Sequence, residues 1–156
     1  MGVSGCGKTT IGQLLSRALT ASFLEGDDFH PEANITKMTA SKPLTDKDRA
    51  LWLDNILQAV NASESPTLTL ACSALTPYVQ SRLTGGTNRT ISWVWLSAPY
   101  ETIAARLKAR DNHFMPVNLL KSQFATLSPP EDAIEVDISG SADAAVDIII
   151  KKLSAL

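Results

Sequence analysis

The sequence has few of the features that mark secreted, membrane-spanning or strongly charged proteins. Two cysteines in 156 residues are too few for a disulfide-dense secreted scaffold. No apolar run is long enough to cross a bilayer, and the N-terminus lacks the basic-then-apolar layout of a signal peptide. The 14 Lys and Arg residues nearly balance the 16 Asp and Glu residues, which argues against binding nucleic acid or an anionic membrane by charge. We therefore expect a soluble cytoplasmic protein with no membrane or nucleic-acid partner.

The spacing of apolar residues predicts alternating helices and strands within one domain, residues 1–156. Helical spacing follows Gly7 and recurs over residues 53–60 and 146–153, and Thr45 with Asp48 is typical of a helix start. The strands are expected at residues 22–25, 67–72, 90–96 and, more weakly, 134–138. This order implies an α/β fold: a parallel sheet of about five strands flanked by helices, with its first strand apparently truncated.

The strongest motif is a phosphate-binding loop at residues 2–9, which matches G-x-x-x-x-G-K-[ST] at every fixed position. Glycines let backbone N–H groups surround a phosphate, and the following helix adds the positive end of its dipole. Lys8 is expected to reach the β- and γ-phosphates, and the Thr9 hydroxyl to ligate Mg²⁺. The nucleotide-binding candidates in this loop are Gly2, Val3, Ser4, Gly5, Cys6, Gly7, Lys8, Thr9 and Thr10.

A strand normally precedes this motif, but only Met1 stands before Gly2. We therefore expect that the natural protein begins several residues upstream with an apolar strand; the alternative is a protein that manages without it. Cys6 occupies a position next to a lysine and a helix start, where a thiol can become acidic. We interpret it as a tolerated small side chain rather than a redox switch, and Cys72 as a core residue.

An acidic segment, residues 25–31, follows the first expected strand. Carboxylates at the carboxyl end of a strand beside a phosphate loop can accept a hydroxyl proton or hold Mg²⁺ through water. A solvated acidic turn is the alternative interpretation of the segment taken by itself.

From residue 1 onward the sequence resembles the gluconokinase family, small carbohydrate kinases built like shikimate and nucleoside monophosphate kinases. The blocks that carry the resemblance run in order to about residue 130: the phosphate loop, Gly26-Asp27-Asp28-Phe29-His30-Pro31, Asn34-Ile35, Lys37-Met38, Pro43-Leu44-Thr45-Asp46, Asp48-Arg49, Trp52-Leu53, Ala71-Cys72-Ser73-Ala74-Leu75, Arg106-Leu107, Arg110, His113-Phe114-Met115-Pro116, Leu119-Leu120 and Ser122-Gln123-Phe124.

The resemblance implies ATP- and Mg²⁺-dependent phosphorylation of D-gluconate to 6-phosphogluconate. Asp27 would orient or deprotonate the attacking hydroxyl, and His30 and Arg49 would bind the gluconate anion. An ion pair with Asp46 is the alternative for Arg49, and a capping or packing role is the alternative for His30. The family often forms dimers, so a homodimer is an open expectation.

Arg106 and Arg110 lie four residues apart on one helix face and lead into a polar loop ending at His113. With the resemblance, residues 106–125 are expected to form a lid that brings both arginines to ATP, with Arg110 among the catalytic residues beside Lys8 and Asp27. Solvated arginines are the alternative. Phe114, Met115 and Phe124 are interpreted as packing that seats this lid.

Two family features are lost after the Cys-Ser-Ala-Leu block. The usual lysine is Thr76, and the usual Tyr-Arg-Asp cluster reads Val79, Gln80 and Ser81, while Arg82 lies on a different helix face. Because two cations are missing beside the acceptor site, two other functions stay open. One is a related kinase for shikimate or another polyhydroxy acid, and the other is a degenerate ATP-binding protein with little transferase activity.

Overall fold

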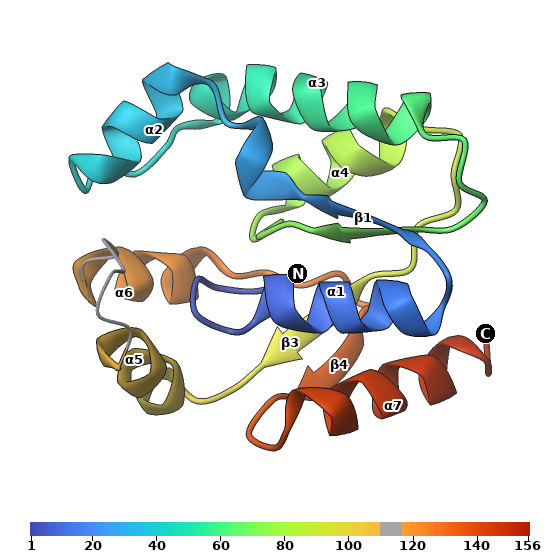
Figure 1. Cartoon of the computed structure of the whole chain (residues 1–156). Coiled ribbons are helices and arrows are strands. Elements are labelled where there is room, and N and C mark those ends of the chain that lie inside the picture. Colours follow the sequence, from blue (N-terminus) through green and yellow to red (C-terminus); the bar gives the residue numbers. More distant parts are fainter. Residues whose placement is uncertain (110–116) are drawn as a thin grey trace.

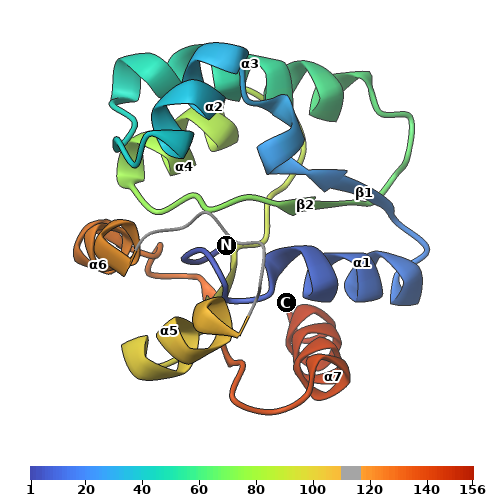
Figure 2. The ribbon, with the colours of Figure 1, turned by 60° about the vertical axis from the view of Figure 1, so that its left-hand side comes forward.

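The computed structural model describes residues 1–109 and 117–156 as an α/β protein in two halves (Figures 1 and 2). The elements are α1 (Lys8–Ala18), β1 (Ser22–Glu25), the 3₁₀ helix η1 (Gly26–Phe29), α2 (Glu32–Thr39), α3 (Asp46–Ala62), β2 (Leu68–Ala71), α4 (Pro77–Gly85), β3 (Val94–Ser97), α5 (Tyr100–Lys108), α6 (Val117–Thr126), β4 (Ile134–Asp137) and α7 (Ala142–Leu153). Helices α2, α3 and α4 lie with β1 and β2 in the upper half of Figure 1, and α5, α6 and α7 lie with β3 and β4 below.

The strands are parallel, as the sequence predicts, but they form two pairs. Strand β1 pairs with β2, with Ser22 opposite Leu68, and β3 pairs with β4, with Val94 opposite Ile134. The α/β class with parallel strands and flanking helices is confirmed. In place of one sheet of about five strands, the described residues contain two two-stranded sheets.

The backbone of Met1 and Gly2 lies between these two pairs. The Met1 amine donates to the Val94 carbonyl oxygen at 2.5 Å, and the Leu96 N–H donates to the Met1 carbonyl oxygen at 3.0 Å. On the other side, the Gly2 N–H donates to the Ser73 carbonyl oxygen at 3.1 Å. Met1 and Gly2 therefore connect β3 to the segment after β2.

Local sequence signals fix several element boundaries where they are expected. Thr45 and Asp48 form the reciprocal capping box at the start of α3, and Pro77 is the first residue of α4. Strand β3 begins at Val94 rather than at residue 90, so the expected strand over 90–96 is shorter at its start and ends one residue later. No helix in residues 1–109 and 117–156 is long and apolar enough to span a membrane.

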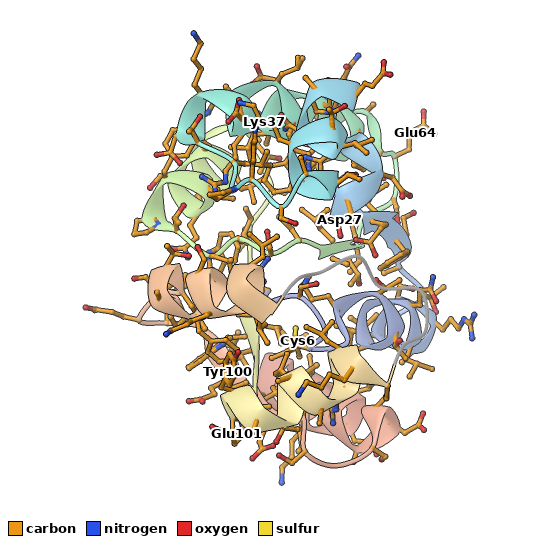
Figure 3. All side chains as sticks on the ribbon, turned by 90° about the vertical axis from the view of Figure 1, so that its left-hand side faces the viewer. Cys6, Asp27, Lys37, Glu64, Tyr100 and Glu101 are labelled. Carbon is orange, nitrogen blue, oxygen red and sulfur yellow. The ribbon has the colours of Figure 1, made fainter. Side chains whose placement is uncertain are left out.

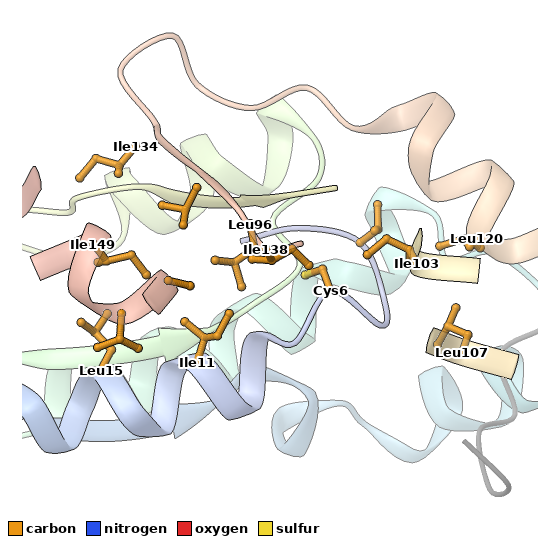
Figure 4. Packing of buried hydrophobic residues seen from close by; sticks show 14 residues of the cluster. Cys6, Ile11, Leu15, Leu96, Ile103, Leu107, Leu120, Ile134, Ile138 and Ile149 are labelled. Atoms are coloured by element: carbon orange, nitrogen blue, oxygen red, sulfur yellow. The ribbon is translucent and has the colours of Figure 1, made fainter. Parts of the chain in front are cut away.

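Each half has its own apolar cluster, and the phosphate loop belongs to the lower one. Figure 4 shows Cys6 packed among Ile11, Leu96 and Ile138. The upper cluster centres on Trp52, and it joins α3, β2 and α4. The buried anchoring of the loop restricts its backbone, which keeps the adjacent N–H groups in place for a ligand.

Helix α1 spans the two halves because it contacts β1 and β2 on one side and α7 on the other. The close approach depends on Gly12, where an added Cβ would lie 2.8 Å from Cε2 of Phe23. Gly26 shows a similar constraint at the end of β1, where an added Cβ would lie 2.6 Å from the Ala71 carbonyl oxygen. The first contact brings α1 close to β1, and the second holds the segment after β1 against the end of β2.

We predict that Gly26→Ala lowers the free energy of unfolding by about 1–3 kcal/mol, because a methyl group would overlap the backbone of β2. Gly85→Ala is the matched control: it lies at the end of α4 with nothing within 4 Å of the added Cβ, so it should be neutral or slightly stabilising. Urea denaturation measures both. Equal stability of the two variants would contradict the close packing of Gly26.

Candidate functional site

The phosphate loop has the backbone conformation that its glycines make accessible. Gly2, Gly5 and Gly7 have φ angles of 145°, 83° and 92°, all in the region that side chains disfavour. At Gly5 an added Cβ would also lie 2.8 Å from the Leu107 side chain of α5. The loop ends at Gly7, which caps α1, so the helix N-terminus faces the space inside the loop.

Three side-chain contacts close this loop. Lys8 Nζ donates to the carbonyl oxygens of Gly2 at 3.2 Å and Val3 at 3.0 Å, so the lysine folds over its own loop. From α6, Gln123 Oε1 accepts the Ser4 N–H at 2.6 Å. These polar partners occupy groups that the motif would otherwise offer to a phosphate.

A cavity of about 230 Å³ adjoins the outer side of the loop. Its wall includes Gly5, Cys6, Gly7, Thr10 and Arg106, together with residues 138 and 140–142 that follow β4. The Arg106 guanidinium donates to the Ile138 carbonyl oxygen at 2.5 Å, so it is held at the rim of this cavity. A larger hollow of about 610 Å³ lies near residues 85–89, away from the loop and the acidic turn.

The acidic turn after β1 contacts the phosphate loop through Glu25. The Thr9 hydroxyl donates to Glu25 Oε2 at 2.6 Å, and Glu25 Oε1 accepts the Asp27 N–H at 3.4 Å as the cap of η1. The Glu25 carboxylate therefore links Thr9 to the turn that carries Asp27. Figure 3 shows Asp27 at the border between the two halves, where its side chain is 70% exposed.

His30 lies beside this turn in a defined environment. Its ring stacks on Trp52, with centroids 4.5 Å apart and an interplanar angle of 10°, and its Nε2 is 4.0 Å from Asp27 Oδ1. The Trp52 indole in turn donates to the Gly26 carbonyl oxygen at 2.7 Å. Burial lowers the pKa of His30 below its ordinary value, an effect that Asp27 opposes and Arg49 reinforces. Burial therefore favours the neutral form of the ring.

The cations around the acidic turn have carboxylate partners. Arg49 donates to Asp46 at 2.9 Å, which is the ion pair that the sequence left as the alternative for this residue. Lys37 and the N–H of Thr45 both donate to Asp48, and these bonds hold the pKa of the Asp48 carboxyl well below its usual range. The positive charge of Arg49 also lowers the pKa of the His30 ring, after the larger effect of burial.

The positions that depart from the family pattern after Leu75 have structural partners here. The Thr76 hydroxyl caps α4 by accepting the Val79 N–H at 3.5 Å. The buried Gln80 amide donates to the carbonyl oxygens of Ala74 and Ser128 at 2.9 and 2.8 Å. Arg82 pairs with Asp54, so it does not replace the missing cations beside His30.

The structure places Arg106 beside the phosphate loop and His30 beside Asp27, and the bond from Thr9 to Glu25 links these two groups, whereas Arg49 is paired with Asp46 on α3. Arg110, His113, Phe114 and Met115 lie outside the described residues. Phe124 packs edge-on against Tyr100, with ring centroids 5.4 Å apart, and joins α6 to α5.

Sequence reasoning did not assign individual roles to Glu25, Asn34 or Gln123. Glu25 was visible as the last residue of an expected strand beside the loop, and this position could have identified it. Asn34 and Gln123 act through contacts across 14 and 119 residues of chain, which no local pattern reveals.

Comparison with known proteins gives matches across most of the chain. The family model for shikimate kinase matches residues 4–129. The chain is 42% identical over 145 residues to the thermosensitive gluconokinase of Escherichia coli (strain K12), covering 89% of this chain and 77% of that protein. It is 41% identical over 157 residues to the gluconokinase of Gluconobacter oxydans (strain 621H), covering 98% and 86%. A solved gluconokinase structure from Sinorhizobium meliloti 1021 matches with a TM-score of 0.88 at 35% identity, covering 99% of this chain and 89% of that chain.

We predict that both thiols are protected in the folded protein. Cys6 is 1% exposed and Cys72 is 4% exposed, and burial raises the pKa of the Cys72 thiol to about 11. At pH 8, Cys72 should therefore react with a thiol reagent at least about a hundredfold more slowly than in denaturant. Rapid labelling of Cys6 in the native protein would instead favour the redox-switch alternative; the urea-unfolded chain is the control for complete labelling.

Proposed function

The chain belongs to the gluconokinase family, which shares the fold of shikimate kinase, and from this membership we propose that it phosphorylates D-gluconate with ATP. The products would be 6-phospho-D-gluconate and ADP. The single observation that carries the proposal beyond the family is the hydrogen bond from Thr9 to Glu25. This bond supports the proposal because it joins the phosphate loop to the acidic turn, so a phosphate donor and an acceptor held by the two segments would be neighbours.

In the transfer, an oxygen–phosphorus bond forms between the gluconate hydroxyl and the γ-phosphorus, while the bond between the γ-phosphorus and the β,γ-bridging oxygen breaks. Lys8 and the loop N–H groups neutralise the phosphate charge, after Lys8 leaves the carbonyl oxygens that it contacts here. Asp27 orients the hydroxyl and receives its proton. Because the transition state is loose, this positioning matters more than strong basicity.

The residues beside the loop suit Mg²⁺, which prefers oxygen ligands and keeps several waters. The Thr9 hydroxyl would hold the ion directly, and the Glu25 carboxylate, 2.6 Å from that hydroxyl, is placed to hold its waters. No group of three or more His, Cys, Asp or Glu side chains in the described part of the chain could hold a metal without such help. When bound, the ion would neutralise charge on the nucleotide phosphates.

Arg106 is a proposed nucleotide ligand because it lies at the rim of the cavity beside the phosphate loop. We assign residues 106–125 to a lid over ATP, and Arg110 to contact with the transferring phosphate. On the acceptor side, His30 and Arg49 are the proposed ligands of gluconate, with Arg49 exchanging its Asp46 partner for the substrate carboxylate.

Two cations of the family pattern are absent at Thr76 and Gln80, so we consider a second acceptor substrate. Gln80 is buried and both of its donor bonds go to backbone carbonyls, so it offers nothing to an anionic substrate. Another polyhydroxy acid such as shikimate is therefore the alternative acceptor. A single domain over residues 1–156, a cytoplasmic location where ATP and the metabolite meet, and a homodimer remain predictions.

We predict that D-gluconate stimulates ADP release from ATP and Mg²⁺ at least about tenfold over the acceptor-free rate, because the acceptor hydroxyl replaces water in the transfer. Shikimate at the same concentration should give no more than the acceptor-free rate. A coupled assay for ADP measures both. Stimulation by shikimate alone would favour the alternative kinase, and ATP binding without stimulation by any polyhydroxy acid would favour the degenerate protein.

We further predict that Asp27→Asn lowers kcat for gluconate about a hundredfold or more, with the KM for ATP little changed, because the amide cannot take the hydroxyl proton. Asp28→Asn is the matched control. It makes the same change one residue along the same exposed 3₁₀ helix and should leave kcat within about twofold of the wild type. Equal losses in the two variants would contradict the role of Asp27.

A further inference from the structure

Asn34 is a buried polar residue of α2 that lies between the candidate acceptor site and α3. Asn34 is 3% exposed, and its side chain lies within hydrogen-bond distance of two described groups. The Nδ2 atom is 2.9 Å from the carbonyl oxygen of Asp48 and 3.3 Å from Nδ1 of His30. These two partners together determine which hydrogen-bonding groups the amide and the ring present to one another.

The carbonyl oxygen of Asp48 can only accept a hydrogen bond. The amide atom that faces it must therefore be the donating Nδ2, because the opposite orientation would place two oxygens against each other. The second hydrogen of the same NH₂ group then points to His30 Nδ1. A neutral imidazole has one donor and one acceptor nitrogen, so His30 Nδ1 must be the acceptor.

We propose that Asn34 is a positioning residue that fixes His30 as the neutral tautomer with its proton on Nε2. The ring then directs an N–H donor from Nε2 toward Asp27 Oδ1, which lies 4.0 Å away. A hydroxyl or carboxylate oxygen of the acceptor would receive this donor. This role rests on the proposed function, whereas the tautomer itself does not.

The groups around the ring agree with a neutral donor. Trp52 covers one face of the ring, Asp27 faces Nε2 from η1, and Arg49 of α3 is the nearby cation. Burial lowers the pKa of His30, so protonation of both nitrogens is disfavoured as well. A neutral ring also serves Asp27, because an imidazolium at this distance would reduce the proton affinity of the carboxylate that must accept the hydroxyl proton.

The direct test is the ¹⁵N and ¹³C chemical shifts of the His30 ring in the wild-type protein, measured by NMR at pH 7.5. The chain has two histidines, so His113→Ala assigns the signals. The expected result is an unprotonated Nδ1 and a protonated Nε2. A protonated Nδ1, in either the other tautomer or the imidazolium, would overturn the proposal, and the protonation state is measured in the wild-type protein itself.

Asn34→Asp reverses the polarity of the contact, because a carboxylate can only accept from Nδ1. We expect Nδ1 of His30 to become protonated, and the KM for gluconate to rise about tenfold, the loss expected for one hydrogen bond, with the KM for ATP unchanged. Asn34→Ala, which removes the donor without adding charge, should give a mixture of tautomers. An unaltered His30 spectrum in both variants would overturn the role of Asn34.

Asn55→Asp is the matched control, because Asn55 Nδ2 donates to the Phe29 carbonyl oxygen at 3.1 Å, next to His30, without contacting the ring. Its His30 shifts should match the wild type. A rise in KM for gluconate in this control equal to that of Asn34→Asp would show a general loosening of the turn and would overturn the positioning role. A wild-type chain inactive on gluconate would instead overturn the proposed function, and the chemical shifts would still decide the tautomer.

Discussion

The arrangement of the whole molecule depends on the hydrogen bonds of Met1 and Gly2, which join two pairs of strands that do not pair with each other. Met1 bonds to β3 on one side and Gly2 bonds to the segment after β2 on the other. The phosphate loop begins at this junction, and α1 leaves it to pack against β1, β2 and α7. The loop is therefore the structural connection between the halves as well as the candidate binding site.

This constraint explains why the proposed site lies at the border between the two halves. The lower half contributes the loop and Arg106, and the upper half contributes Asp27, His30 and Arg49. Glu25 connects the two sets through Thr9. A kinase needs the phosphate donor and the acceptor hydroxyl within reach of each other and away from competing water, so a site shared by two halves suits the transfer.

Local patterns predicted much of this structure from sequence. The glycines of the loop and the capping box at Thr45 and Asp48 follow directly from residue type and spacing. The separation of the strands into two pairs could not be predicted from local patterns, because the residues of one strand do not identify the strand with which it pairs. Likewise Arg49 was open between an ion pair and a ligand, and Asn34 was assigned no role, because both depend on side-chain contacts between elements.

The central claim is that a phosphate held by the loop and a hydroxyl held by the acidic turn meet in one site. A crystal structure with D-gluconate, Mg²⁺ and a non-hydrolysable ATP analogue tests this most directly. The account predicts that Lys8 releases the carbonyl oxygens of Gly2 and Val3 to contact the terminal phosphates, and that a gluconate hydroxyl lies between the γ-phosphate and Asp27. Gluconate bound away from Asp27, or a terminal phosphate directed away from the acidic turn, would contradict it.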